Sequence, residues 1–166
     1  MTSNVTIEDI VIPTKTMKSG DLVKTFFEYC VAAGVPALPF RDHNGLIQGF
    51  VSLKRVMGKD CLPNYLVELA GILHNDMSCT SHAMEKIHEL FQKQVDIYVD
   101  NSIQFIASDT ILIRTVALME QYDTNFIFVA DGDAKQTSDY KGVVTSLAVA
   151  KKMLQIESVE NGVKEY

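Results

Sequence analysis

The sequence predicts an α/β protein (in the α+β sense) of two related units, each a small mixed sheet packed with helices. The main observation is a repeat, because residues 37–53 reappear in altered form as residues 126–147. Each copy is an apolar strand, an acidic turn and a second strand that opens on glycine and ends on a hydroxyl residue. A helical pattern precedes and follows each copy. Such a duplication indicates two pseudo-twofold-related units with a cleft where they meet.

Composition limits the classes of function. The chain has 166 residues, of which 47% are hydrophobic and 22% charged, as in an ordinary globular protein with a core. The net charge is −6 and no basic stripe occurs, which argues against nucleic-acid binding. No apolar run approaches the ~20 residues that span a bilayer, and residues 1–6 do not resemble a secretory signal. Cys30, Cys61 and Cys79 are odd in number and far apart, which argues for a reducing compartment. We expect a cytoplasmic protein without a membrane partner.

A helix is predicted early in each unit. Ser19 or Asp21 is placed to cap the first helix, and Gly34 to end it. Ser108 and Asp109 hold the capping positions of the second. Apolar residues at helical spacing predict the inner faces. These faces comprise Leu22, Val23, Phe26, Phe27, Cys30 and Val31 in the first helix, and Ile111, Leu112, Val116 and Met119 in the second.

A strand pair is predicted after each of these helices. Asp42-His43-Asn44-Gly45 is a hairpin turn signal, and a longer polar turn takes its place in the second unit. The predicted strands are residues 36–40 and 47–52 in the first unit, and residues 103–106, 126–130 and 142–145 in the second.

The predicted domain boundaries follow the order of the chain. We place the first repeat at residues 5–60 and the second at residues 96–155. Residues 61–95 are predicted as a helical insert and residues 156–166 as a flexible tail. The inward positions of two insert helices are Leu62, Leu66, Leu69, Ala70 and Leu73 in the first, and Met84, Ile87, His88 and Phe91 in the second.

Four short motifs occur in the same order in both repeats. In the first repeat they are Asp9-Ile10-Val11-Ile12-Pro13, Lys18-Ser19-Gly20-Asp21, Leu38-Pro39-Phe40-Arg41-Asp42 and Gly49-Phe50-Val51-Ser52. In the second repeat they are Asp96-Ile97-Tyr98-Val99, Ala107-Ser108-Asp109-Thr110, Ile127-Phe128-Val129-Ala130-Asp131 and Gly142-Val143-Val144-Thr145. In this order they resemble a tandem cystathionine β-synthase-type (CBS) domain pair. The resemblance covers most of the chain apart from the insert and the tail.

The resemblance implies a function as well as a fold. CBS pairs are regulatory modules rather than enzymes, and their inter-unit clefts often take an adenosine-containing ligand such as AMP, ATP or S-adenosylmethionine. They usually form flat dimers. We therefore expect a non-catalytic, ligand-sensing homodimer whose ligand is an adenine nucleotide or another phosphate-containing small molecule.

The closing motif departs from the family pattern in both repeats. The family places a carboxylate three residues after the closing hydroxyl, where it can accept hydrogen bonds from ribose hydroxyls. The hydroxyls are present as Ser52 and Thr145, but Arg55 and Ala148 replace the carboxylates. Arginine has no acceptor, and the loss of such a pair costs about 1.5–3 kcal/mol. Arg55 with Lys54 suits a phosphate-rich ligand or a carboxylate, and the simpler interpretation is that both are solvated surface charges beside the strand.

The predicted ligand site combines polar residues with apolar walls. The polar candidates are Ser52, Lys54, Arg55 and Thr145, and the apolar ones are Val11, Ile12, Pro39 and Phe40. Phe40 is equally consistent with the core.

Two other functions stay open. The first is a degenerate pair that acts as a ligand-free dimerisation or protein-interaction scaffold. The second is a small enzyme, which has little support because no catalytic motif occurs. We expect no metal either, since the histidines and cysteines of the insert lack the spacing of a zinc site.

Overall fold

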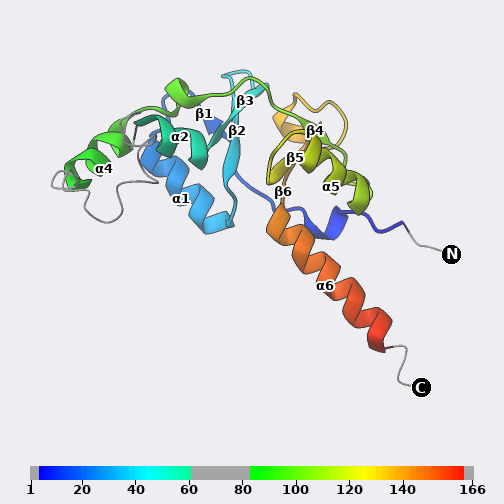
Figure 1. Cartoon of the computed structure of the whole chain (residues 1–166). Helices are drawn as coiled ribbons and strands as arrows, with labels where there is room; N and C mark the ends of the chain where they lie inside the picture. Colours follow the sequence, from blue (N-terminus) through cyan, green and yellow to red (C-terminus); the bar gives the residue numbers. More distant parts are fainter. Residues whose placement is uncertain (1–3, 61–82, 163–166) are drawn as a thin grey trace. The chain divides into compact units, whose positions relative to one another are not determined.

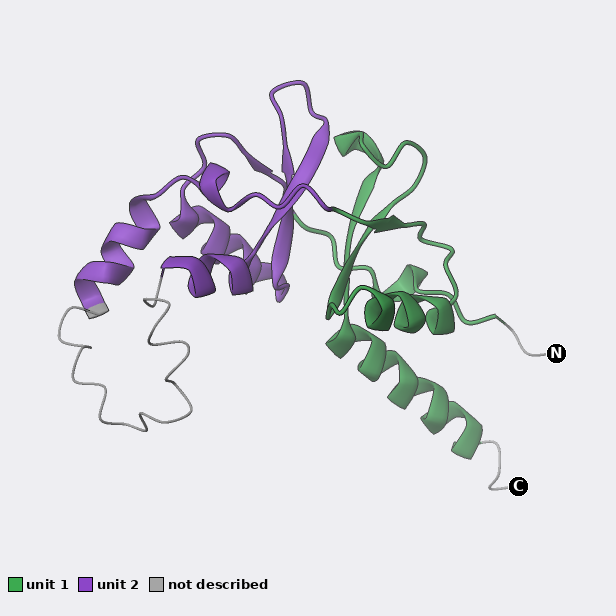
Figure 2. Ribbon diagram, turned by 45° about the horizontal axis from the view of Figure 1, so that its top comes forward, with its two compact units in different colours: residues 1–14, 103–166 green, residues 15–102 purple. Residues whose placement is uncertain are grey.

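The contacts of the chain divide it into two compact units that do not follow the predicted boundaries. The computed structural model describes residues 4–60 and 83–162. Unit 1 consists of residues 1–14 and 103–166, and unit 2 of residues 15–102 (Figure 2). Each unit therefore contains the sheet of one repeat and a short segment that the sequence assigns to the other.

Unit 2 is a three-stranded mixed sheet with helices (Figure 1). Strand β1 pairs with β2 in parallel, and β2 pairs with β3 antiparallel. The elements are β1 (Met17–Lys18), α1 (Val23–Ala33), β2 (Ala37–Arg41), β3 (Ile47–Ser52), α2 (Leu53–Asp60), α4 (Ala83–Gln92) and the 3-10 helix η3 (Val95–Tyr98). The predicted hairpin turn is confirmed. The Asp42 carboxylate accepts the Asn44 and Leu46 amides, and Gly45 has a φ of 80° that favours glycine.

Unit 1 repeats the same topology. Its sheet has the order β4-β5-β6, with a parallel and then an antiparallel pair. The elements are η1 (Glu8–Ile10), β4 (Phe105–Ile106), α5 (Leu112–Gln121), β5 (Phe126–Ala130), η4 (Thr137–Asp139), β6 (Tyr140–Thr145) and α6 (Ser146–Gly162). The predicted fold class is confirmed, because both repeats form small mixed sheets packed with helices.

The two segments at the start of the repeats, residues 5–14 and 93–102, are called the leading segments. Each packs in the unit of the other repeat. In unit 1 the Ile7 side chain is fully buried in a core with Leu112, Ile127 and Val144. In unit 2 Val95 is equally buried. The leading segments pack there because their apolar side chains are buried and their backbone groups form hydrogen bonds in that unit. The order of the chain specifies neither of these contacts.

The predicted side-chain caps of the first helix in each unit are wrong. Neither α1 nor α5 has a side-chain cap. The first amide of α1, that of Val23, donates to the Lys93 carbonyl at 2.9 Å, and that of Leu112 in α5 donates to the Val5 carbonyl at 2.7 Å. Both acceptors belong to leading segments. Because a distant backbone satisfies these helix starts, Ser19 and the other predicted caps are free to bind elsewhere.

The predicted inner faces of the helices need five corrections. Val31 is 80% exposed on α1 and Ile111 is 39% exposed at the start of α5. On α4, Met84 is 83% and Ile87 48% exposed. His88 is exposed as well. The inward position of Phe91 is confirmed, because its ring lies edge-on 5.2 Å from that of Phe27 on α1, and Leu90, which was not predicted, is buried as well. Periodicity alone did not distinguish which apolar side faces the neighbouring helix.

The remaining boundary differences concern the insert and the tail. The predicted first insert helix, at 62–73, lies outside the described residues. Residues 156–162, predicted as a flexible tail, continue α6. Ile156 packs against the core of unit 1. This contact explains why α6 continues through a mostly polar stretch of sequence.

Candidate functional site

The predicted hydroxyl of unit 2 lies where β3 passes directly into α2. Ser52 Oγ accepts the amide of Arg55 at 3.2 Å. The amide of Leu53, the residue that follows Ser52, donates to the Pro36 carbonyl at 2.9 Å. Ser52 therefore caps α2, while its hydroxyl proton remains a donor that this bond does not use.

Unit 1 has the same junction between β6 and α6. Thr145 Oγ1 accepts the Ala148 amide at 3.1 Å, and the Ser146 amide donates to the Asn125 carbonyl at 2.9 Å. Thr145 is only 7% exposed. Each predicted hydroxyl thus caps the start of a helix. The amide that donates to it belongs to Arg55 or Ala148, the residues at the positions where a carboxylate was expected.

Each junction lies beside a leading segment. In unit 2, Phe50 and Asp100 exchange two backbone hydrogen bonds of 2.9 and 2.8 Å. In unit 1, Ile12 and Val143 exchange two of 2.9 Å. Asp100 and Ile12 are therefore structural equivalents. The second leading motif is shifted by one position from the sequence alignment, which paired Asp9 with Asp96.

Glycine makes this close approach possible. A Cβ on Gly49 would lie 2.3 Å from the Asp100 carbonyl oxygen. A Cβ on Gly142 would lie 2.1 Å from that of Ile12, and Gly142 also has a φ of 152°. Both distances are far below van der Waals contact. Glycine is needed at the third position of β3 and of β6 because a backbone passes over it.

The junction of unit 2 contains an ion pair that the sequence analysis did not predict. Arg55 Nη1 lies 3.5 Å from Asp100 Oδ2, with the side chains 43% and 32% exposed. The other carboxylate oxygen accepts the Ser102 hydroxyl at 2.5 Å and the Ser102 amide at 2.9 Å. These two hydrogen bonds and the charge of Arg55 lower the pKa of Asp100, although partial burial opposes them. Arg55 thus has its counter-charge in the leading segment.

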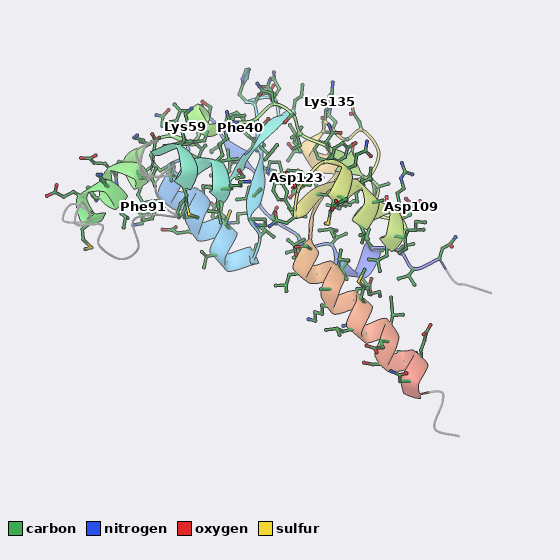
Figure 3. All side chains as sticks on the ribbon, viewed as in Figure 1. Phe40, Lys59, Phe91, Asp109, Asp123 and Lys135 are labelled. Carbon is green, nitrogen blue, oxygen red and sulfur yellow. The ribbon has the colours of Figure 1, made fainter. Side chains whose placement is uncertain are left out.

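Matching lysines tie the helices to the leading segments. Lys59 near the end of α2 (labelled in Figure 3) donates to the Ile97 carbonyl at 3.4 Å. Lys152 on α6 pairs with the Asp9 carboxylate. The hydrogen bond from Lys152 lowers the pKa of Asp9. The junction of unit 2 is therefore held to its leading segment at three points and that of unit 1 at two.

A second carboxylate of unit 2, that of Asp60, contacts the second leading segment. Asp60, at the end of α2, accepts the Tyr98 hydroxyl and lies 3.3 Å from Lys93 Nζ. The Tyr98 bond is the main reason that the pKa of Asp60 is lowered. This contact brings together the two ends of the insert.

The predicted apolar walls are split between the units. Pro39 and Phe40 lie in β2 of unit 2, where Phe40 (Figure 3) is only 8% exposed and pairs in register with Gly49. The structure therefore favours the core for Phe40. Val11 and Ile12 are half-buried beside the junction of unit 1. Ser52, Arg55 and exposed Lys54 thus share one junction, and Thr145 shares the other with Val11 and Ile12. Ligand binding by these residues stays a prediction.

The described residues contain neither a cluster of metal-ligating side chains nor a membrane-spanning helix. In residues 4–60 and 83–162, no three His, Cys, Asp or Glu side chains gather as a metal site. The insert residues Cys79, His74 and His82 lie outside those ranges. Within the same part of the chain, no helix is long and apolar enough to cross a membrane.

Two mixed sheets with exchanged leading segments define the class of fold, which is that of a tandem CBS-domain pair. The CBS-pair protein CBSX2 from Arabidopsis thaliana is 20% identical, with a TM-score of 0.65 over 94% of this chain and 99% of that one. A CBSX2 structure in complex with AMP is 22% identical, with a TM-score of 0.62 over 92% and 99%. The CBS domain of a membrane protein from Sphaerobacter thermophilus is 16% identical, with a TM-score of 0.61 over 89% and 87%. No protein-family model and no curated protein matches the sequence.

Proposed function

We propose that this chain is a non-catalytic CBS-pair regulatory module that senses a phosphate-containing small molecule of the adenine-nucleotide type. The observation that carries the proposal is the junction of unit 2, where Ser52, Lys54 and Arg55 present a hydroxyl and two cations at the start of α2. The structural likeness to CBSX2, which has been solved with AMP, supports the same ligand class.

The ion pair of Arg55 is compatible with such a ligand. Both partners are substantially exposed, and exposed pairs contribute only about 0–1 kcal/mol. A phosphate offers the guanidinium charge-assisted, bidentate hydrogen bonds, which are stronger. Arg55 can therefore exchange its present partner for a ligand at little cost.

The two junctions are not equivalent as anion sites. The closing motif of unit 1 has Thr145 and Ala148 where unit 2 has Ser52 and Arg55. It presents neither a cation nor a carboxylate. We therefore expect one nucleotide-binding event per chain, at unit 2. The sequence-based prediction of a ligand shared between the units stays a prediction.

Calorimetry tests the proposal. AMP, ADP, ATP, inorganic phosphate and adenosine are titrated into the purified chain. We expect the phosphorylated nucleotides to bind and Arg55→Gln to weaken them by about 10- to 100-fold, as expected for a lost charge-assisted contact. Lys24→Gln, an exposed lysine on α1 of the same unit, is the matched control and leaves the affinity unchanged. Flat titrations with every compound reject the ligand-sensing function.

The second candidate is a ligand-free dimerisation or interaction scaffold. It is favoured by α6, where Leu147 is 79% and Leu154 64% exposed. The two leucines are one heptad apart, on the side opposite buried Val149, which is typical of a helix that packs against another helix. The homodimer and the cytoplasmic location predicted from the sequence belong to either candidate.

Sedimentation of the chain over a range of concentrations tests the scaffold. A dimer that Leu154→Glu dissociates, together with flat ligand titrations, supports it. The control is Gln155→Glu, which adds the same charge at an exposed position of α6 outside the face that carries the two leucines. A monomer at all concentrations argues against it.

A further inference from the structure

Asp100 stands next to the proposed ligand site without belonging to its predicted residues. Its main chain is bonded to Phe50, two residues before Ser52. Its side chain lies 3.5 Å from Arg55 and is 32% exposed. The Ser102 hydroxyl and amide hold one of its oxygens. A carboxylate is thus fixed in orientation beside the cations and remains accessible.

The junction consequently presents opposite chemistries side by side. Arg55 and Lys54 are donors only, and an ionised carboxylate is an acceptor only. A ligand that binds the cations through an anionic group approaches Asp100 as well. If the ligand brings only negative charge, it displaces Arg55 from Asp100 and adds a like-charge repulsion. If it also brings hydroxyl donors, Asp100 receives hydrogen bonds in place of Arg55.

We infer that Asp100 is the specificity-determining residue of this site and selects phosphorylated molecules that carry neighbouring hydroxyl groups over bare phosphate. It thereby takes the acceptor role that Arg55 cannot perform at the closing position. The inference rests on the proposed function, since it names which phosphate compounds the same site prefers. Asp100 attracts hydroxyl donors and repels anions, so its removal has opposite effects on the two kinds of ligand.

The test compares four probes: AMP, 2′,3′-dideoxy-AMP, ribose 5-phosphate and inorganic phosphate. In the unaltered chain we expect AMP to bind at least about tenfold more tightly than its dideoxy analogue, as for a lost charge-assisted hydrogen bond. In Asp100→Asn this ratio falls toward one, and inorganic phosphate binds several-fold more tightly. Ribose 5-phosphate follows AMP. A residue with only a structural role weakens all four probes alike.

Two further variants guard the result. Ser102→Ala removes the hydroxyl that orients Asp100 and is expected to reduce the AMP ratio by a few-fold while the carboxylate stays in place. It serves where Asp100→Asn does not fold, as judged by circular dichroism. Asp109→Asn removes an exposed carboxylate of unit 1, labelled in Figure 3, and leaves the ratio unchanged.

The outcomes separate this inference from the proposed function. AMP binding that depends on Arg55 but keeps the same dideoxy ratio in Asp100→Asn, or in Ser102→Ala where that variant replaces it, overturns the role of Asp100 alone. Binding of all four probes without any preference also overturns it. If no probe binds, the proposed function and the inference fail together.

Discussion

Arg55 on α2 and Asp100 in the second leading segment form an ion pair, with Nη1 3.5 Å from Oδ2. The resemblance implies an acid at the position of Arg55 in the closing motif. The helix carries the base and the leading segment carries the acid. Unit 1 has Ala148 and Ile12 at the corresponding positions and therefore no charge at either. The two halves of one duplicated fold thus present different chemistry.

Restoring a carboxylate in unit 1 is expected to create a second nucleotide site. In Ala148→Asp the new acid lies at the start of α6, where a negative charge is stabilised by about 0.3–1 kcal/mol. We expect AMP affinity in unit 1 to rise by about 10- to 100-fold and calorimetry to show two binding events per chain. Ala148→Asn lacks the charge and is the control. If Ala148→Asp still shows one binding event per chain, the missing carboxylate is not what prevents nucleotide binding in unit 1.

The two strand glycines are expected to tolerate no side chain. Gly142→Ala places a Cβ 2.1 Å from the Ile12 carbonyl oxygen at a φ of 152°. We expect it to lower the free energy of unfolding by about 2–4 kcal/mol in urea titrations. Gly49→Ala, where only space is short, should cost about 1–3 kcal/mol. Gly58→Ala on α2 meets nothing within 4 Å, and it should stabilise the chain by about 0.5–1 kcal/mol. Equal effects at all three positions contradict this account.

The first leading segment is expected to stabilise the second repeat. Ile7 is fully buried in the core of unit 1. Ile7→Ala should lower the free energy of unfolding by about 2–4 kcal/mol. Hydrogen exchange should show faster exchange in residues 103–162 first. Val31→Ala, at a position 80% exposed, is the control and should change stability by less than about 0.5 kcal/mol. Faster exchange confined to residues 15–60 would mean that the segment belongs to its own repeat.

Acid is expected to weaken the turn of unit 1. The hydrogen bonds from the Ser108 hydroxyl and amide lower the pKa of Asp131 from its ordinary value of 3.8. A lowered folded-state pKa contributes stability above pH 3.8, and this contribution is lost as pH falls toward the lowered value. Urea midpoints from pH 6 to 2 should therefore fall less steeply in Ser108→Ala. Ser138→Ala, an exposed hydroxyl of the same unit, should keep the original slope. Parallel curves for all three chains contradict the assignment.

The order of elements and the strands were accessible from the sequence because their signals are local. The Asp42 to Gly45 turn and the apolar runs of β2 and β5 specify hairpins through residues a few positions apart. The closing glycines and hydroxyls were visible for the same reason. The role of the glycines was not visible, since Gly49 makes room for the backbone of Asp100, which comes much later in the chain.

The helix starts and the charged site were not accessible in this way. Ser19 has the composition of a cap, yet its hydroxyl donates to Asp96 at 2.5 Å, and the backbone of Lys93 completes α1 instead. The partner of Arg55 was missed because Asp100 comes 45 residues later in the chain. The only local signal was its position directly after the second leading motif.

The sequence by itself determined the duplication, the hairpins and the loss of both closing carboxylates, because each is written in neighbouring residues. The tertiary structure alone decided which leading segment completes which core and which acid faces Arg55. Those choices depend on burying Ile7 and Val95 and on satisfying backbone groups across long separations in the chain. Such long-range pairings leave no periodic pattern in the sequence.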